Sequence, residues 1–428
     1  MIQPIELFEA YKLFKNQWKD AEYIKRIQEK KLRKLIKHSY EKVPYYRSLF
    51  DSINLKPEHV QSIEDLKKIP LLSKKIIKSL PVKELIAKGI NIAKSRTATT
   101  SGSTSIPLKV YYNWQDARMI GIALVRNLMS CGVKPWYKIA EFSGFAELPY
   151  KRRFFDRFGI WRCWNISAWE EPKNWIDILQ RWKPQVIYGY VLTLKLLART
   201  LMEKNIKDIN PQIVISTSGV LDEASRKLMR SAFRAKVFDF YGSWEGGTIA
   251  WECPTCSGYH INSDMVIVEV LKEGNPVSPG QEGEVVITNL HSSAMPFIRY
   301  RQEDVVILSE EKPICGRPFP LMKHIKGRLA DFITLSSGKR ISPHPFFHLL
   351  DYAPEVAQWT LVQETFDKLS IKIVPTENFD KSFISKIEMK LRKLVGENVE
   401  INISLVNKIK AGPSHKIRVV SSKVSNSD

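Results

Sequence analysis

The chain has 428 residues, of which 44% are hydrophobic, 11% aromatic and 26% charged. This is an ordinary globular composition with enough apolar residues for a large core, and it excludes a mainly disordered or low-complexity protein. The longer apolar stretches, such as Met119–Val133, are interrupted by charges such as Arg126, so we expect no membrane-spanning helix. The first residues mix acidic and basic side chains where a secretory signal needs a continuous apolar block, so we expect no export.

Lysine and arginine number 66 against 45 aspartates and glutamates, which gives a formal net charge of +21. This excess favours an anionic partner, and nucleic acid, a nucleotide or an acidic lipid would each satisfy it. Much of it lies in the runs 25–37 and 67–78, where a solvated helix face is the simpler interpretation. The five cysteines are too few for a disulfide framework, which favours a reducing compartment, and we expect a cytoplasmic protein.

The pattern of apolar residues predicts an α/β protein. Residues 20–50 are predicted to form a surface amphipathic helix, because apolar residues recur at steps of three and four among lysines and glutamates. From about 95 to 245, β-rich runs alternate with helical patterns, which predicts layered α/β sheets. The expected strands there are 185–190, 213–217 and 236–241, and the expected helices are 114–129, 192–204 and 222–233.

Turn-rich segments separate the apolar runs between about 265 and 310, which predicts a small antiparallel β subdomain. After Gly327 the expected order is strand, turn at Ser337 and Gly338, strand, helix over 381–395 and strand over 399–406. This order predicts a separate small α+β domain. The expected division is therefore a large N-terminal domain, residues 1–327, and a C-terminal domain, residues 328–428.

Five segments carry residue types suited to nucleotide chemistry. The run TATTSGSTSIPLKV, residues 97–110, is rich in hydroxyls, and its small residues let backbone amides approach phosphate oxygens. It lacks the Gly-Lys-Ser/Thr ending of a Walker loop, and taken alone it equally fits a linker. The other four are VFDFYGSWEGG (237–247), PFIRYRQEDVV (296–306), IKGRLADFI (325–333) and AGPSHKIRVV (411–420). They place a glutamate and an aspartate near strand ends, where carboxylates hold Mg²⁺ or ligands, and a lysine in the last loop.

Together, the types, order and spacing of these segments resemble those of adenylate-forming enzymes, and most of all the phenylacetate-CoA ligase family, over about residues 95–420. The patterns TSGST, YGSWE, GYHIN, TNL, MPFIRYR and GR resemble the branch of capsular polysaccharide biosynthesis proteins. The resemblance implies a large N-terminal domain that binds ATP and the acyl substrate, and a small mobile C-terminal lid. It implies that ATP and Mg²⁺ activate a small carboxylic acid and that CoA is the usual acyl acceptor.

The resemblance also implies residue roles. The hydroxyl-rich loop would cradle the β and γ phosphates with Thr100, Ser101, Gly102, Ser103 and Thr104. Tyr241 and Gly242 would line the adenine and acyl pocket, and Asp304 would bond the ribose hydroxyls. Arg328 would lie near the hinge and the ribose, and Glu245 would assist Mg²⁺. Lys416 would bridge the carboxylate and the α-phosphate, where a cation stabilises the developing transition-state charge.

Three positions depart from the family pattern. Ser105 stands where the loop has its second glycine, Glu303 replaces the glycine before the ribose aspartate, and Ala330 occupies the hinge position of an aspartate or lysine. A catalytically weak or silent nucleotide-binding relative therefore stays open, as does an adenylating enzyme whose acceptor is an amine or a sugar hydroxyl. A nucleic-acid-binding protein is the alternative suggested by the charge, but we find no RNA-binding or helix-turn-helix pattern and expect no nucleic-acid partner. Relatives also suggest a homodimer.

A cysteine and histidine cluster is separate from these segments. The run CPTCSGYH holds Cys253, Cys256 and His260, and Cys315 follows later in PICGR. Three thiolates and one imidazole make a tetrahedral zinc set. Relatives of this branch have cysteines near these positions, although their CPCGR pattern reads PICGR here. A turn with ordinary free cysteines is the alternative interpretation.

Overall fold

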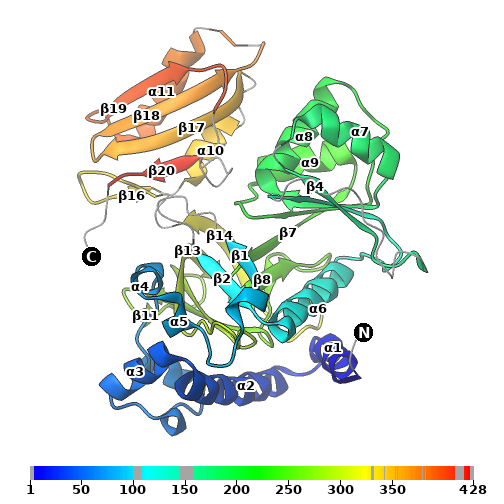
Figure 1. The fold of residues 1–428 in the computed structure, drawn as a ribbon. Helices are drawn as coiled ribbons and strands as arrows, with labels where there is room; N and C mark the ends of the chain where they lie inside the picture. The colour runs from blue at the N-terminus through cyan, green and yellow to red at the C-terminus, as the bar shows by residue number, and fades with distance from the viewer. Residues whose placement is uncertain are drawn as a thin grey trace.

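The computed structural model describes residues 4–99, 108–144, 158–168, 170–328, 332–341, 343–351, 353, 355–377, 379–380, 382–409 and 419–424. A large N-terminal body of sheets and helices carries a smaller C-terminal domain at one end (Figure 1). The body is a mixed α/β structure and the C-terminal part is a small α+β domain, which confirms the predicted fold class.

Helices α1 (Pro4–Asn16), α2 (Ala21–Lys42) and α3 (Pro44–Ser52) lie along the edge of the molecule opposite the C-terminal domain (Figure 1). Helices α4 (Lys74–Ser79) and α5 (Val82–Leu85) lie nearer the middle of the molecule, and three short 3-10 helices span Pro57–His59, Glu64–Lys68 and Ile92–Lys94. The Asp20 side chain caps α2 by accepting a hydrogen bond from the backbone N–H of Tyr23. The predicted single helix over 20–50 is wrong in one respect. Pro44, which has no N–H and is tolerated only in a first turn, begins a new helix after Val43.

A twelve-stranded sheet runs through the body in the order β11-β10-β12-β13-β14-β9-β8-β7-β6-β5-β3-β4. The strands from β4 to β7 are parallel to one another, and all the pairs from β7 to β11 are antiparallel. The parallel strands are β3 (Ile139–Ser143), β4 (Cys163–Ser167), β5 (Val186–Tyr190), β6 (Ile213–Thr217) and β7 (Lys236–Ser243). The remaining strands are β8 (Gly247–Glu252), β9 (Tyr259–Ile261), β10 (Val266–Lys272), β11 (Asn275–Pro276), β12 (Glu282–Asn289), β13 (Tyr300–Leu308) and β14 (Leu321–Arg328). The predicted antiparallel region is thus confirmed, but it is hydrogen-bonded to the parallel strands as one sheet.

Helices cover both faces of the parallel strands. On one face α7 (Pro172–Trp182), α8 (Val191–Glu203) and α9 (Glu223–Phe233) share a core with the strands. On the other, residues from the end of α6 (Trp114–Ser130) pack against the opposite sides of the same strands. Strands buried on both faces are almost continuously apolar, which is why the sequence located β5, β6 and β7. A separate ribbon pairs β1 (Arg96–Thr99) with β2 (Lys109–Tyr112).

The C-terminal domain has its own core, formed between residues 333 and 420. Its four strands lie in the order β19-β18-β17-β20. The elements are β15 (Ile333–Thr334), β16 (Arg340–Ile341), α10 (His344–Asp351), β17 (Val356–Thr365), β18 (Lys368–Pro375), α11 (Ser382–Val395), β19 (Glu400–Leu405) and β20 (Val420–Ser422). The predicted turn at Gly338, with φ of 78°, joins β15 to β16. The boundary between residues 327 and 328 stays a prediction.

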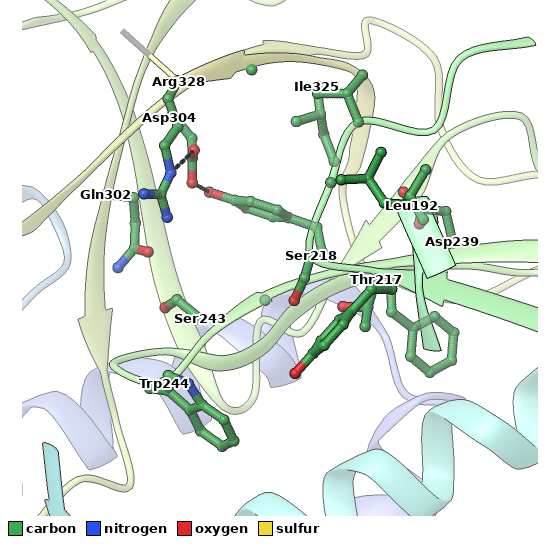
Figure 2. A pocket seen from close by; sticks show the side chains of 18 of the residues that line it. Leu192, Thr217, Ser218, Asp239, Ser243, Trp244, Gln302, Asp304, Ile325 and Arg328 are labelled. Atoms are coloured by element: carbon green, nitrogen blue, oxygen red, sulfur yellow. Dashed lines mark hydrogen bonds and ion pairs between the residues drawn. The ribbon is translucent and has the colours of Figure 1, made fainter. Parts of the chain in front are cut away.

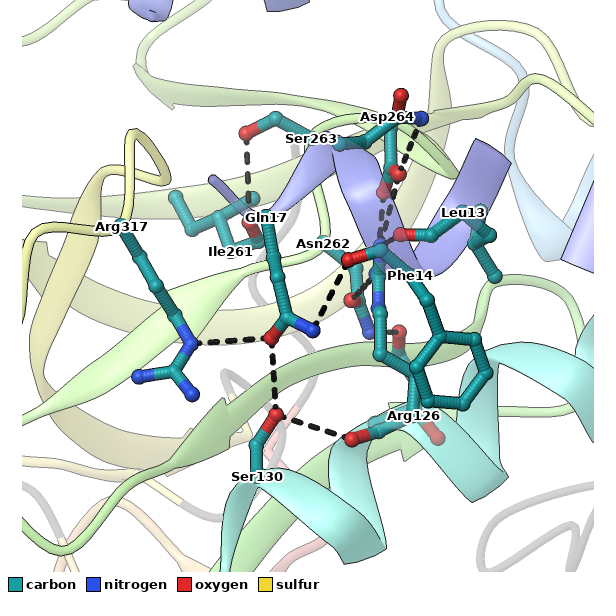
Figure 3. A network of polar contacts seen from close by, with 12 residues as sticks. Leu13, Phe14, Gln17, Arg126, Ser130, Ile261, Asn262, Ser263, Asp264 and Arg317 are labelled. Carbon is teal, nitrogen blue, oxygen red and sulfur yellow. Dashed lines mark hydrogen bonds and ion pairs between the residues drawn. The ribbon is translucent and has the colours of Figure 1, made fainter. Parts of the chain in front are cut away.

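A buried polar network joins α1 to α6 and to the segment after β9 (Figure 3). Arg126 and Asp264 have fully buried side chains and pair through Nη1 to Oδ2 at 2.7 Å and Nη2 to Oδ1 at 3.0 Å. Asn16 Nδ2 donates to the same carboxylate at 2.9 Å, and Arg126 Nη1 donates to the carbonyl of Leu13 at 3.0 Å. Losing one partner of such a buried pair costs about 3–5 kcal/mol. Because Asn16 and the Leu13 carbonyl are hydrogen-bonded to this pair, the network fixes α1 on the body. Among the described helices, we find none with the length and apolar character needed to cross a membrane.

Candidate active site

A cleft of about 1190 Å³ opens between the N-terminal body and the C-terminal domain. The carboxyl ends of β5, β6 and β7 supply part of its lining, which is where open α/β sheets bind ligands. Tyr190, Thr217 and Ser218 line it from these strand ends, and Lys372 and Lys408 line it from the C-terminal domain. Figure 2 shows side chains of both charge signs and several hydroxyls around this space.

The turn between β7 and β8 is fixed by its glycines. A Cβ on Gly242 would lie 2.6 Å from the carbonyl oxygen of Gly247, so only glycine fits at this close backbone approach. Gly247 has φ of 67°, where residues with a side chain are strained. The hydroxyl of Tyr112 donates to the carbonyl of Trp244 and ties the turn to β2. The turn therefore presents Gly242, Ser243 and Glu245 to the cleft, all of which line it.

The structure brings three of the predicted nucleotide residues together. Tyr241 Oη donates to Asp304 Oδ2 at 2.7 Å, and Arg328 Nε lies 3.6 Å from Asp304 Oδ1 (Figure 2). Asp304 and Arg328 face each other because β13 and β14 pair them directly. Burial and the neighbouring Asp304 carboxylate raise the pKa of Tyr241 well above its usual value, so its hydroxyl stays a donor. The result is an oriented carboxylate at the edge of the cleft, suited to bonding a sugar diol.

Glu245 is buried beneath this group. Its Oε1 accepts a hydrogen bond from Tyr300 Oη at 3.0 Å, and its backbone carbonyl accepts one from Asn289 Nδ2 at 2.8 Å. Burial raises the pKa of Glu245, while Lys74 and Arg328 oppose that shift. A carboxylate that lines a cleft in this way is a ligand type that Mg²⁺ accepts. The Glu245 carboxylate therefore fits a magnesium ligand.

Lys74 is a cleft residue that the sequence did not identify, because it lies in a lysine run interpreted as a solvated face. Burial and the cations Lys78 and Arg328 lower its pKa, although Glu245 and Glu303 act on it in the opposite direction. Leu72 holds this segment on β13 by exchanging hydrogen bonds with Arg299 and Arg301, both at 2.9 Å. The N-terminal region therefore contributes a cation to the cleft.

Several predicted residues lie outside the described residues. They are Thr100, Ser101, Gly102, Ser103, Thr104, Ser105, Ala330 and Lys416. Thr97 and Ala98, the first two residues of the hydroxyl-rich run, line the cleft. Ile409 and Val419, on either side of the segment that contains Lys416, line it as well. The roles of the phosphate loop and of Lys416 stay predictions.

The cysteine and histidine cluster is assembled by three chain segments. Ligand atoms of Cys253, Cys256, His260 and Cys315 all lie within 4.8 Å of one another. His260 Nε2 is 3.3 Å from Cys253 Sγ and 3.5 Å from Cys315 Sγ, and the Cys256 N–H donates to Cys253 Sγ at 3.4 Å. His260 Nδ1 lies 3.4 Å from the carbonyl of Phe319, which leaves Nε2 facing the sulfurs. None of the four is among the described residues that line the cleft.

Similar proteins are found over most of the chain. Residues 333–423 match the family model described as the CapK C-terminal domain. A phenylacetate-coenzyme A ligase of Thermus thermophilus is 26% identical over 376 residues, which cover 84% of this chain and 83% of the relative. Protein CapK of Staphylococcus aureus is 24% identical over 420 residues, which cover 89% and 92%. Over most of its length the chain is therefore similar to phenylacetate-coenzyme A ligases and to protein CapK, and its C-terminal domain matches the CapK model.

Solved structures show the same fold as this chain. A 2-hydroxyisobutyryl-CoA ligase in its postadenylation state superimposes with a TM-score of 0.79 at 19% identity, covering 95% of this chain and 91% of that one. The same protein in its thioesterification state gives a TM-score of 0.66.

Proposed function

We propose that the protein uses ATP and Mg²⁺ to activate a carboxylic acid as an acyl-adenylate and then transfers the acyl group to CoA. The observation that supports this most is the convergence of Tyr241, Gly242, Glu245, Asp304 and Arg328 on one cleft beneath the C-terminal domain. They come from β7, the turn after it, β13 and β14.

In the first step a substrate carboxylate oxygen attacks the α-phosphorus, the bond to the bridging oxygen breaks, and pyrophosphate leaves. Asp304, oriented by Tyr241 and Arg328, would accept hydrogen bonds from the ribose hydroxyls. Glu245 would hold Mg²⁺, which supplies charge neutralisation at the phosphates when bound. Lys416 would stabilise the charge that develops in the transition state, a contribution commonly worth about 3–4 kcal/mol.

In the second step the sulfur of the acceptor thiol attacks the acyl carbon, AMP leaves, and the thiol proton passes to solvent. The relatives named as coenzyme A ligases support CoA as the acceptor. An amine or a sugar hydroxyl would attack the same acyl carbon. Incubation with each acceptor and detection of the thioester, amide or ester distinguishes them.

The proposal is tested by exchange of labelled pyrophosphate into ATP with a panel of aryl and aliphatic acids, with hydroxylamine trapping of the activated acyl group. We expect exchange that depends on one class of acid and that falls about a hundredfold or more in Lys416→Ala. Lys423→Ala, which removes an exposed lysine of the same domain paired with Glu364, is the matched control and should keep the exchange rate. ATP binding without exchange for any acid would instead identify a catalytically silent relative.

We also propose that Cys253, Cys256, His260 and Cys315 bind one structural zinc ion. The three sulfurs and His260 Nε2 form a compact donor set of the structural type, and burial lowers the pKa of His260 to about 4, which keeps the imidazole neutral. Elemental analysis of purified protein should find one zinc per chain, and Cys315→Ser should reduce both the zinc content and the melting temperature. Cys163→Ser removes a cysteine outside the cluster and is the control. Metal-free protein with an unchanged melting temperature would contradict the proposal.

A further inference from the structure

The outer face of α1 exposes aromatic side chains. Phe8 is 55% exposed, Tyr11 is 60% exposed, and Trp18, in the turn just after the helix, is 58% exposed. The spacing from Phe8 to Tyr11 and Lys15 keeps these positions on one helix face. The backbone N–H of Trp18 donates to the Lys15 carbonyl at 3.0 Å, and the centre of the Trp18 ring lies 4.7 Å from the guanidinium carbon of Arg317. Large aromatic side chains that share an exposed face mark an interaction site.

This exposure belongs to a helix that is firmly held. Leu13, Asn16 and Gln17 are buried on the opposite face of α1 and its end, where Leu13 packs with Ala123 and Met265. The buried network of Figure 3 adds hydrogen bonds from Asn16 and to the Leu13 carbonyl. Because the inner face is fixed in this way, the aromatic face is directed away from the body.

Lysines lie among these aromatic residues. Lys12 Nζ lies 4.0 Å from the centre of the Phe8 ring, and Lys15 Nζ lies 5.6 Å from that of Tyr11. The neighbouring α2 adds exposed cations on its solvent side. These are Lys25, Arg26, Lys30, Arg33, Lys34, Lys37 and Lys42, against the exposed acids Glu22 and Glu41. Aromatic rings interleaved with cations are the pattern of helices that lie in the interface of a bilayer.

We propose that the edge formed by α1 and α2 binds the surface of an anionic membrane. Aromatic side chains enter the headgroup region, and lysines and arginines are attracted by anionic lipid. The positive charge of this edge favours an anionic membrane over a second copy of the chain as the partner, because two cationic edges would repel each other. This edge lies opposite the C-terminal domain (Figure 1), so docking would leave the cleft between the domains open to solvent. The surface does not depend on the proposed ligase activity.

The test is co-sedimentation of the full chain with vesicles of phosphatidylcholine alone or with about 30% phosphatidylglycerol. We expect binding to the anionic vesicles that weakens as salt rises, and little binding to the neutral ones. The triple variant Phe8→Ser, Tyr11→Ser, Trp18→Ser should lose about tenfold or more in binding. Unchanged binding by this variant, or no binding of the parent chain to anionic vesicles, overturns the proposal.

Matched control variants distinguish binding through this surface from nonspecific hydrophobic binding to vesicles. Trp136→Ser, Phe366→Ser, Met389→Ser removes three comparably exposed apolar side chains elsewhere and should leave vesicle binding unchanged. Both triple variants should retain the parent melting temperature, which shows that they fold. Brominated lipid should quench the parent more than a Trp18→Phe variant, because Trp18 enters the headgroup region. Equal quenching of the two, or tight binding to duplex DNA with none to vesicles, would refute membrane docking.

Discussion

Replacement of Glu303 by glycine should stabilise the N-terminal domain. Glu303 has φ of 61°, in the left-handed region, within β13 where the register with β12 shifts. A residue with a Cβ pays about 1–2 kcal/mol in this conformation, while glycine loses roughly 0.5–1 kcal/mol more backbone entropy on folding. The difference predicts that the free energy of unfolding rises by roughly 0.5–1 kcal/mol in Glu303→Gly.

Urea unfolding followed by tryptophan fluorescence measures the effect, with Glu303→Ala as the control. The alanine variant loses the same carboxylate but keeps a Cβ at positive φ. Glu303→Gly should therefore unfold at higher urea than Glu303→Ala, by about 1 kcal/mol in free energy. If the two variants unfold at the same urea concentration, the reasoning from backbone strain is refuted.

The same two variants test the charge of Glu303. Its carboxylate lines the cleft beside Asp304 and acts electrostatically on Lys74 and Tyr300. A like charge about 8 Å from a phosphate costs roughly 1 kcal/mol at an effective dielectric constant of about 40. Both variants should therefore lower the KM for ATP in the exchange assay by about fivefold. A KM that is unchanged or higher in both would show that Glu303 does not face the nucleotide.

Two further perturbations probe the cleft and the core. Lys74→Ala should raise the KM for ATP about tenfold, because it removes a half-buried cation beside Glu245. Lys75→Ala, which removes an exposed lysine of the same helix, is the control and should leave the KM unchanged. Equal KM values in the two variants would exclude Lys74 from the nucleotide site. His291 Nε2 lies 2.8 Å from Lys31 Nζ, and burial followed by that ammonium lowers the pKa of His291 from 6.5 to about 3. The unfolded chain gains this proton below pH 6.5 and the native state does not until about pH 3, so stability is lost as pH falls, by about 2 kcal/mol at pH 5. Urea unfolding of His291→Asn should show a smaller loss than the parent between pH 7 and pH 5, and equal losses would contradict the assignment.

The apolar pattern of the sequence predicted individual helices and strands where their burial is regular. The strand over 213–217 is β6 without change, because a strand buried on both faces is apolar throughout. The helix predicted over 381–395 is α11, which is described from Ser382 to Val395. The strands β3 and β4 were not predicted individually, because half of their residues are only partly buried and their apolar pattern is weaker. Residues 20–50 show that one proline outweighs a continuous amphipathic pattern.

Contacts between residues far apart in the chain could not be predicted from the sequence, except where both residues lie in family motifs. Arg126 was visible only as a charge that interrupts an apolar run, yet it is fully buried against Asp264, 138 residues away. Tyr241 and Asp304, which the resemblance singled out separately, are hydrogen-bonded to each other, and their roles toward a nucleotide stay predictions. Lys74 lies outside any motif. It comes near Glu245 and Glu303 because Leu72 is hydrogen-bonded to the chain at β13, a contact that the sequence does not indicate.

The proposed zinc site and the cleft are joined by one strand. The β7–β8 turn with Glu245 lies at one end of β8, and Cys253 follows its other end, about 20 Å away at the rise of an extended strand. Just before the cysteine, Glu252 pairs with Arg226 at 2.7 Å and accepts the N–H of Asp239 at 2.8 Å, so β8 is held there without the metal. Removal of zinc should therefore lower the melting temperature while leaving the KM for ATP unchanged at low temperature. A KM that rose in step with zinc loss would mean that the metal positions the nucleotide turn through β8.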